Sequence, residues 1–439
     1  MILYAIFRFL CWFSLPAYFK SIKVIGKENR IFSGPLIVVS NHPNTMMDAI
    51  HVGYHLKQRI GFLANAGIFN NPLAARIWRY LQVIPVYRQQ DLAKGERMDN
   101  SESFRECYSF LDKGKTLMIL PEGSSWSEMK LRAIRSGTAR IALEYQSKYG
   151  SDKGLTILPC SLNYSDPTQF RSKLIKIYGE PIDLKPFAEA YEEHPRKAVR
   201  QLTQVIRERL SKNMVILDHK GRERMFRYLR DLLPEAEAQE NGEAQLRQQQ
   251  NLAEQIQDFA DSEPETYKEV LQKGDRFFKK LRKSGLTDSQ FRSGKNSFLG
   301  KAIASTLLLL ITLPVLLVGT LLNGFHFLIP AFLVPKLTKE VEYHAVMKMI
   351  MSWLLGLLWI PTAIILFHSL SGLPGWWTPI FAFGAPITGI LAWIWYTGFQ
   401  RSRNFWNWEF NRKDIGQLKK LRKEWMDSID DHIKLEAAE

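Results

Sequence analysis

The feature that most restricts the fold is an apolar block at residues 302–335, which contains no Asp, Glu, Lys or Arg. One helical crossing of a bilayer needs roughly 20 apolar residues, so this block is longer than a single crossing requires. Two further blocks, residues 349–366 and 379–399, are each about one crossing long and are joined by the uncharged segment "SLSGLPGWW". The carboxyl-terminal part of the chain is therefore predicted to lie in a membrane.

Basic residues at the ends of these blocks predict how they cross. Lys348 precedes the second and third blocks, and Arg401 and Arg403 follow them. Cytoplasmic ends of membrane helices carry an excess of Lys and Arg, so both ends of this pair are expected in the cytoplasm. The two blocks are therefore predicted to form a helical hairpin.

The first block is flanked by cations too, Lys301 and Lys336, and it contains "GTLLNG" at residues 319–324. The same rule places both of its ends in the cytoplasm. We expect a helix, a break at this segment and a return; a single tilted helix followed by an interfacial segment is the alternative. An even number of crossings predicts an integral membrane protein whose folded domain faces the cytoplasm.

The first residues of the chain, 2–19, are apolar but do not resemble a signal peptide. They lack a basic start and a small-residue cleavage site, and Arg8 interrupts the apolar run. We predict an uncleaved helix in the membrane interface, with Trp12 and Tyr18 as amphipathic anchors. An ordinary core helix is the alternative.

From residue 35 to residue 182, short β-branched runs alternate with amphipathic stretches. This alternation predicts an α/β fold with a largely parallel sheet flanked by helices. The expected strands are residues 36–40, 60–64, 83–87, 116–120, 155–164 and 174–179. The expected helices are residues 46–57, 72–81, 101–112, 136–148 and 193–212.

Residues 195–297 are charged, helical in pattern and poor in strand signals. Residues 235–255 are rich in Glu, Gln and Ala, which predicts either a solvated helix or a flexible linker. The stretch "KGDRFFKKLRKSG", continued by Arg292, Lys295 and Lys301, is a basic juxtamembrane segment of the kind that anionic lipid headgroups attract.

These patterns divide the chain into five parts. They are a membrane-interface helix and lead-in (1–30), the α/β domain (31–190), a charged helical region or linker (191–297), a transmembrane region (298–400) and a basic cytoplasmic helical tail (401–439).

The formal net charge of +15 predicts an anionic partner, which is a nucleic acid, a phospholipid surface or a phosphorylated substrate. The cations cluster beside the apolar blocks, many of the 12 Trp residues flank them, and no nucleic-acid motif is recognised, so a membrane is favoured. Cys11, Cys107 and Cys160 lie far apart, which argues against a disulfide framework or a zinc site and favours a reducing compartment.

The segment "SNHPNTMMDAI" places His42 and Asp48 where the first buried strand ends. A neutral imidazole can take a proton from an alcohol when a carboxylate fixes its tautomer and stabilises the imidazolium that forms. Alone, such a pair is more typical of a turn or a helix cap.

Further polar residues follow other strands. Glu122 and Gly123 come directly after the strand "TLMIL", at the sheet edge where open α/β sheets bind ligands. The segment "IPVYR" ends another strand with an arginine, and more cations follow Gly123. Four of these cations are candidates for a phosphate pocket: Arg88, Lys130, Arg132 and Arg135.

In this order, the blocks "NHPNTMMD", "IPVYR", "PEGSS" and the strand containing Pro159 resemble the phospholipid and glycerol acyltransferase (PlsC-like) superfamily over residues 37–181. The resemblance is strongest to the glycerol-3-phosphate acyltransferase branch that carries carboxyl-terminal membrane segments. Two features depart from the superfamily pattern. The spacing is His-x5-Asp instead of His-x4-Asp, and Ser125 replaces the arginine of the E-G-T-R block.

The resemblance implies a membrane enzyme that moves a fatty acyl group from acyl-CoA or acyl carrier protein to a hydroxyl of glycerol 3-phosphate, without a cofactor or metal. His42 would be the general base and Asp48 would orient it. Backbone N–H groups near Gly123 and Ser124 would stabilise the oxyanion, and Glu122 with the arginines would hold the glycerol phosphate.

Two other functions remain open at this stage. In the first, the acceptor is lysophosphatidate instead of glycerol 3-phosphate. In the second, the chain is a membrane lipid-binding or scaffolding protein that has the same fold but does not catalyse acyl transfer. The presence of both His42 and Asp48 speaks against the second.

Overall fold

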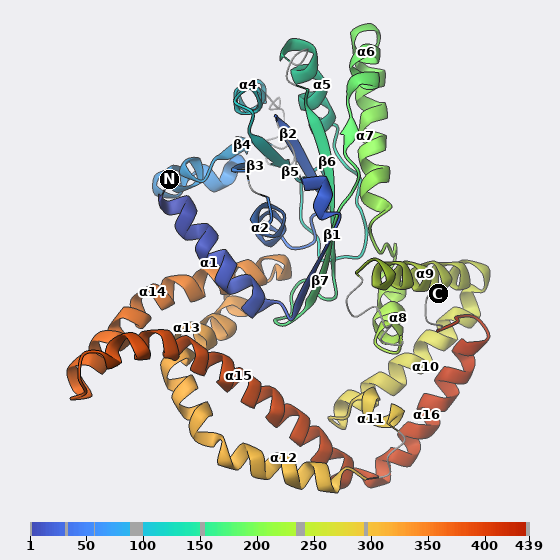
Figure 1. Ribbon diagram of the computed structural model, residues 1–439. Helices are drawn as coiled ribbons and strands as arrows, with labels where there is room; N and C mark the ends of the chain where they lie inside the picture. The colour runs from blue at the N-terminus through green and yellow to red at the C-terminus, as the bar shows by residue number, and fades with distance from the viewer. Residues whose placement is uncertain are drawn as a thin grey trace.

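A computed structural model describes residues 2–30, 34–56, 58–87, 100–149, 154–233, 242–293 and 297–435. The amino-terminal half forms an eight-stranded sheet in the order β1-β7-β6-β2-β5-β3-β4, with β8 paired to β6 (Figure 1). The strands are β1 (Ser21–Ile25), β2 (Leu36–Ser40), β3 (Ile60–Asn65), β4 (Val83–Val86), β5 (Thr116–Ile119), β6 (Thr156–Tyr164), β7 (Lys173–Tyr178) and β8 (Ile182–Asp183).

Most strand pairs in this sheet are parallel, as predicted. The pairs β2·β5, β2·β6, β3·β5, β3·β4 and β1·β7 are parallel, and β6 pairs antiparallel with β7 and β8. The sequence patterns miss β1 and β8. Every residue of β1 is partly exposed at the sheet edge, so this strand lacks the continuous apolar run of a buried parallel strand.

Helices cover both faces of the sheet. They are α1 (Ile2–Tyr18), α2 (Met46–Tyr54), α3 (Pro72–Tyr80), α4 (Ser101–Asp112), α5 (Gly137–Tyr149), α6 (Lys185–Glu193) and α7 (Pro195–Ser211). Side chains alternate along β2: Ile37 and Val39 pack with α4, α5 and α7, whereas Leu36 and Val38 pack with α1 and α2. The predicted helices are present, with ends shifted by a few residues.

A helical bundle follows the sheet domain. It contains α8 (Lys220–Arg230), α9 (Gly242–Ser262), α10 (Pro264–Lys283), α11 (Asp288–Arg292) and α16 (Arg412–Asp430). In α9, Leu252 and Ile256 are buried in the core of this bundle. Residues 242–255 are helical, as the first alternative predicts, but this helix is not solvated on every side because Leu252 packs into the core. Residues 235–241 and Lys295 lie outside the described residues.

The apolar blocks form α12 (Leu299–Ile311), α13 (Leu313–Leu337), α14 (His344–Leu370) and α15 (Trp377–Phe410), and α12 runs beside α15 (Figure 1). The described residues contain three helical segments long and apolar enough to cross a membrane, Leu313–Leu337, Val341–Leu370 and Trp377–Phe410.

The break expected at residues 319–324 is wrong, because α13 continues through them. The interruption lies at Thr312, and Pro314 stands in the first turn of α13, where its missing N–H leaves no bond unmade. Gly319 has a packing role instead: an added Cβ would lie 2.2 Å from Thr388 O of α15. Small residues allow membrane helices to approach this closely.

Helix α1 packs against the sheet domain and against α14. Trp353 of α14 donates a hydrogen bond of 2.7 Å to Ser14 Oγ. Trp12 is exposed, as an interfacial anchor requires, but Tyr18 is buried and its ring packs edge-on against Phe170. The prediction that Tyr18 is an interface anchor is therefore wrong, since its side chain belongs to the core.

Candidate active site

His42 and Asp48 meet in the turn between β2 and α2. Asp48 lies in the first turn of α2 and is fully buried, and its Oδ2 atom is 3.0 Å from His42 Nδ1. The same oxygen accepts a 2.7 Å hydrogen bond from the backbone N–H of Asn44. The His42 side chain is 15% exposed. A carboxylate at Nδ1 favours the tautomer that leaves Nε2 free to accept a proton.

Thr45 lies within the turn that joins His42 to Asp48. Its φ of +44° is unusual for a residue with a β-branched side chain. Two contacts hold this conformation: Thr45 N donates to Ser125 Oγ (2.9 Å), and Thr45 Oγ1 donates to the carbonyl of Glu342 (3.0 Å). Ser125 therefore supports the His42 turn.

Tyr164, at the end of β6, also binds Asp48. Its hydroxyl donates a 2.9 Å hydrogen bond to Asp48 Oδ1, so both carboxylate oxygens are engaged. Burial raises the pKa of Asp48 above its ordinary value, and hydrogen bonds from His42, Asn44 and Tyr164 oppose the rise. Tyr164 is not among the residues predicted from the sequence; the available signal is its place at the end of a strand beside β2.

Glu122 follows β5 and connects two backbone segments. Oε1 accepts a 2.8 Å hydrogen bond from His42 N, and Oε2 accepts a 3.1 Å hydrogen bond from Arg132 N. Burial raises the pKa of Glu122, and these backbone hydrogen bonds oppose the rise. In this arrangement Glu122 fixes the His42 turn relative to the segment that carries the predicted cations.

Gly123 and Ser124 have partners in the following turn. Gly123 has a φ of +71°, and its backbone N–H donates to Leu120 O (3.1 Å). An added Cβ would lie 2.8 Å from Arg135 Nε, so the Arg135 side chain rests against this turn. Ser124 Oγ accepts a 3.1 Å hydrogen bond from Trp126 Nε1.

The predicted cations differ in surroundings. The Arg132 guanidinium pairs with Glu128 at 2.9 Å and lies 4.0 Å from the centre of the Trp126 ring. Lys130 and Arg135 are exposed. Arg88 lies outside the described residues. Arg132 and Arg135 are thus close to Glu122 and Gly123, but the charge of Arg132 already has a carboxylate partner.

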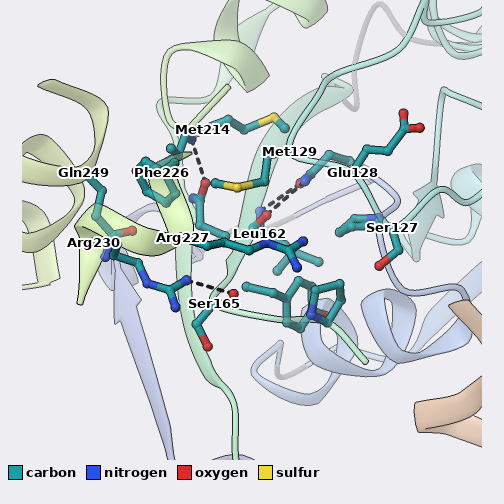
Figure 2. Close-up of a pocket in the computed structure, with 16 residues that line it drawn as sticks. Ser127, Glu128, Met129, Leu162, Ser165, Met214, Phe226, Arg227, Arg230 and Gln249 are labelled. Atoms are coloured by element: carbon teal, nitrogen blue, oxygen red, sulfur yellow. Dashed lines mark hydrogen bonds between the residues drawn. The ribbon is translucent and has the colours of Figure 1, made fainter. Parts of the chain in front are cut away.

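A pocket opens beside the His42 turn (Figure 2). Asn41 and Pro43, which flank His42, line it together with Ser127. Its opposite wall carries Arg227 and Arg230 of α8. Neither arginine was predicted from the sequence, because α8 lies far from His42 along the chain and carries no local motif.

The connection between α13 and α14 also reaches the site. The backbone N–H of Ser127 donates a 3.1 Å hydrogen bond to Glu342 Oε1, while the carbonyl of Glu342 accepts from Thr45. Glu342 thus contacts the His42 turn and the wall of the pocket. It brings the apolar helices into direct contact with the candidate site.

The cysteines do not resemble nucleophiles. Cys107 and Cys160 are buried, and burial raises the pKa of each thiol to about 12. Reactive cysteines need a depressed pKa.

Comparisons with known proteins begin with a family model. Residues 21–163 match the family model described as Acyltransferase, and they include His42, Asp48 and Glu122. A 112-residue stretch is 33% identical to Glycerol-3-phosphate O-acyltransferase 2 of Saccharomyces cerevisiae, covering 25% of this chain and 15% of the yeast protein. A 153-residue stretch is 25% identical to the chloroplastic 1-acyl-sn-glycerol-3-phosphate acyltransferase LPAT1 of Arabidopsis thaliana, covering 34% of this chain and 38% of the plant protein.

Among solved structures, the chain is similar to the 1-acyl-sn-glycerophosphate acyltransferase PlsC from Thermotoga maritima, with 23% identity and a TM-score of 0.31. The match covers 43% of this chain and 71% of the other. The chain matches only 15% to 38% of the length of the curated relatives named above.

Proposed function

Since residues 21–163 form an acyltransferase domain of the PlsC-like superfamily, we propose that the chain transfers a fatty acyl group from a thioester donor to a hydroxyl of glycerol 3-phosphate. The observation that carries this proposal is the 3.0 Å contact between His42 Nδ1 and buried Asp48, next to an open pocket. This is the arrangement that general-base catalysis on an alcohol needs.

The reaction proceeds in two stages. Asp48 holds the imidazole by Nδ1–H, and His42 Nε2 removes the proton from the acceptor hydroxyl as its oxygen attacks the thioester carbonyl carbon. The C–S bond of the tetrahedral intermediate then breaks, and the leaving thiolate takes the proton from His42. The products are an acyl ester and a free thiol on coenzyme A or acyl carrier protein.

Membrane placement fits this reaction, because acyl chains and the lipid product partition into the bilayer. We propose that the chain is an integral membrane protein with its catalytic domain facing the cytoplasm. Phe298 N, before α12, donates to Glu409 Oε1 near the end of α15 (2.6 Å), while Glu342 after α13 contacts Thr45. The first contact joins the start of α12 to α15, and the second joins the α13–α14 connection to the sheet domain. The proposed cytoplasmic side is supported by the cations that flank the apolar blocks, Lys301, Lys336, Lys348, Arg401 and Arg403.

The identity of the acceptor is tested by supplying each candidate acceptor with each candidate acyl donor. Purified protein in detergent receives labelled acyl-CoA or acyl carrier protein with glycerol 3-phosphate or lysophosphatidate, and the products are identified. We expect lysophosphatidate as the main product, formed from glycerol 3-phosphate. Phosphatidate formed only from added lysophosphatidate would assign the second acceptor, which the similarity to the plant protein favours. No product with any pair would favour a lipid-binding or scaffolding role.

A further inference from the structure

We propose that Arg227 of α8 binds a phosphate group of a substrate in the pocket beside His42. This inference rests on the proposed acyl transfer and adds a residue outside the matched region 21–163. It starts from a pocket lined by distant parts of the chain, among them the His42 turn, the segment at Ser127 and helix α8.

The lining of the pocket combines apolar side chains with the two arginines of α8. Figure 2 shows the Arg227 side chain extending from α8 toward the segment that contains Ser127. The apolar lining comes from Met129, Leu162, Met214, Val215 and Phe226. Such a surface suits a ligand with an organic body and a charged phosphate, because orientation then follows from the few polar groups.

The charge of Arg227 is weakly neutralised. Its nearest ion-pair contact is Glu223 Oε2 at 3.8 Å, and the other oxygen of Glu223 accepts a 2.9 Å hydrogen bond from Met129 N. Glu128 also lines the pocket, but it pairs with Arg132. The Arg227 side chain is 44% exposed, so its guanidinium has donors available for the paired hydrogen bonds that phosphates accept.

Helix α8 is held firmly enough to place this side chain. Met225, Phe226 and Leu229 are buried in the bundle core, and the bond from Met129 N to Glu223 joins the helix to the sheet domain. Arg230 has a different role: it donates a 2.8 Å hydrogen bond to the carbonyl of Ser165 and shapes the wall of the pocket.

The inference also accounts for a departure from the family pattern. Ser125 stands where the superfamily has the arginine of E-G-T-R, and it supports the His42 turn through Thr45 N. Arg132 is engaged by Glu128 and Trp126. Arg227 therefore supplies, from another part of the chain, a cation that the turn after β5 lacks at position 125.

Glycerol 3-phosphate and coenzyme A both carry phosphate, so the test separates them. Binding of each is measured by calorimetry on the full-length protein in detergent, for the wild type, Arg227→Gln and Arg227→Lys. Arg224→Gln is the matched control, because Arg224 is on the same helix, is 51% exposed and pairs with Asp275 instead of lining the pocket.

We expect Arg227→Gln to weaken one ligand by roughly tenfold to a hundredfold, the scale of a charged hydrogen bond, while Arg227→Lys recovers part of the loss. The affected ligand identifies the source of the phosphate. Equal affinities in Arg227→Gln and Arg224→Gln for both ligands, or no binding to the wild type, would overturn the inference. Loss of acyl transfer on substitution of His42 tests the proposed function separately, so the two failures are distinguishable.

Discussion

The hydroxyl of Tyr164 donates a 2.9 Å hydrogen bond to Asp48 Oδ1, on the opposite side of the carboxylate from His42. In Tyr164→Phe, the buried carboxylate loses a donor that opposes the rise of its pKa. We expect kcat to fall roughly tenfold, the scale of one hydrogen bond to a charged group, with a smaller change in KM. Steady-state kinetics of the wild type and Tyr164→Phe, recorded over a range of pH, measure kcat and KM. An unchanged kcat would show that the Tyr164 contact is only structural.

Glu342 ties the membrane helices to the site through Ser127 N and Thr45 Oγ1. Replacing it by Ala removes the side-chain acceptor for Ser127 N, so we expect kcat to fall several-fold while the protein stays folded, since one hydrogen bond contributes about 1 kcal/mol. Glu340→Ala, at an exposed position in the same connection, is the control and should retain full activity. Equal activities of the two variants would contradict a positioning role for Glu342.

Lys176 is buried beneath α2, with Nζ 2.6 Å from both His51 O and His55 Nδ1. Burial lowers the pKa of Lys176 to about 7, whereas the unfolded chain holds this proton up to a pH of about 10.5. Between these values the unfolded state binds more protons, so stability rises with pH from about 7 toward 10. The denaturation midpoint, measured as a function of pH, reports this rise in stability. We expect the midpoint of Lys176→Met to depend less on pH between about 7 and 10.

Lys173→Met, at an exposed position on the same strand, should keep the wild-type slope. A persistent slope in Lys176→Met would assign the pH dependence to other groups. Burial also lowers the pKa of His55 to about 3. Unfolded histidine binds a proton below a pH of about 6.5, so stability should fall further as the solution is acidified.

Gly319 and Gly384 test the packing of the apolar helices. An added Cβ at Gly319 would lie 2.2 Å from Thr388 O, whereas one at Gly384 would have no neighbour within 4 Å. We expect Gly319→Ala to destabilise the protein by about 1–3 kcal/mol, as overpacking does. Gly384→Ala should have little effect. Thermal midpoints in detergent compare the two, and equal midpoints would rule out the close approach of α13 and α15.

Local periodicity was enough to predict much of the fold. The runs at β2, β5 and β6 are apolar and bounded by turns, and the helices α4 and α5 alternate with them in the pattern of parallel sheets. Edge strand β1 was missed because it is only partly buried. The break expected in the first apolar block is wrong, because Gly319 permits close packing of α13 on α15 and does not interrupt the helix.

The candidate site was predictable only where its residues belong to short motifs that directly follow a buried strand. His42, Asp48 and Glu122 follow strand ends, which a sequence reveals directly. Tyr164, Glu342 and Arg227 reach the same place from distant elements, and only the folded arrangement brings them there. The pairing of Arg132 with Glu128 is an i,i+4 relationship, but its stacking on Trp126 depends on the shape of the turn.

The central claim is that His42, held by Asp48, removes the proton from the acceptor hydroxyl. The most direct measurement is the rate of acyl transfer to glycerol 3-phosphate by purified wild type and His42→Ala at saturating concentrations of both substrates. A rate reduced roughly a hundredfold or more is the predicted result, the scale of a lost general base. Equal rates for the two proteins would contradict it.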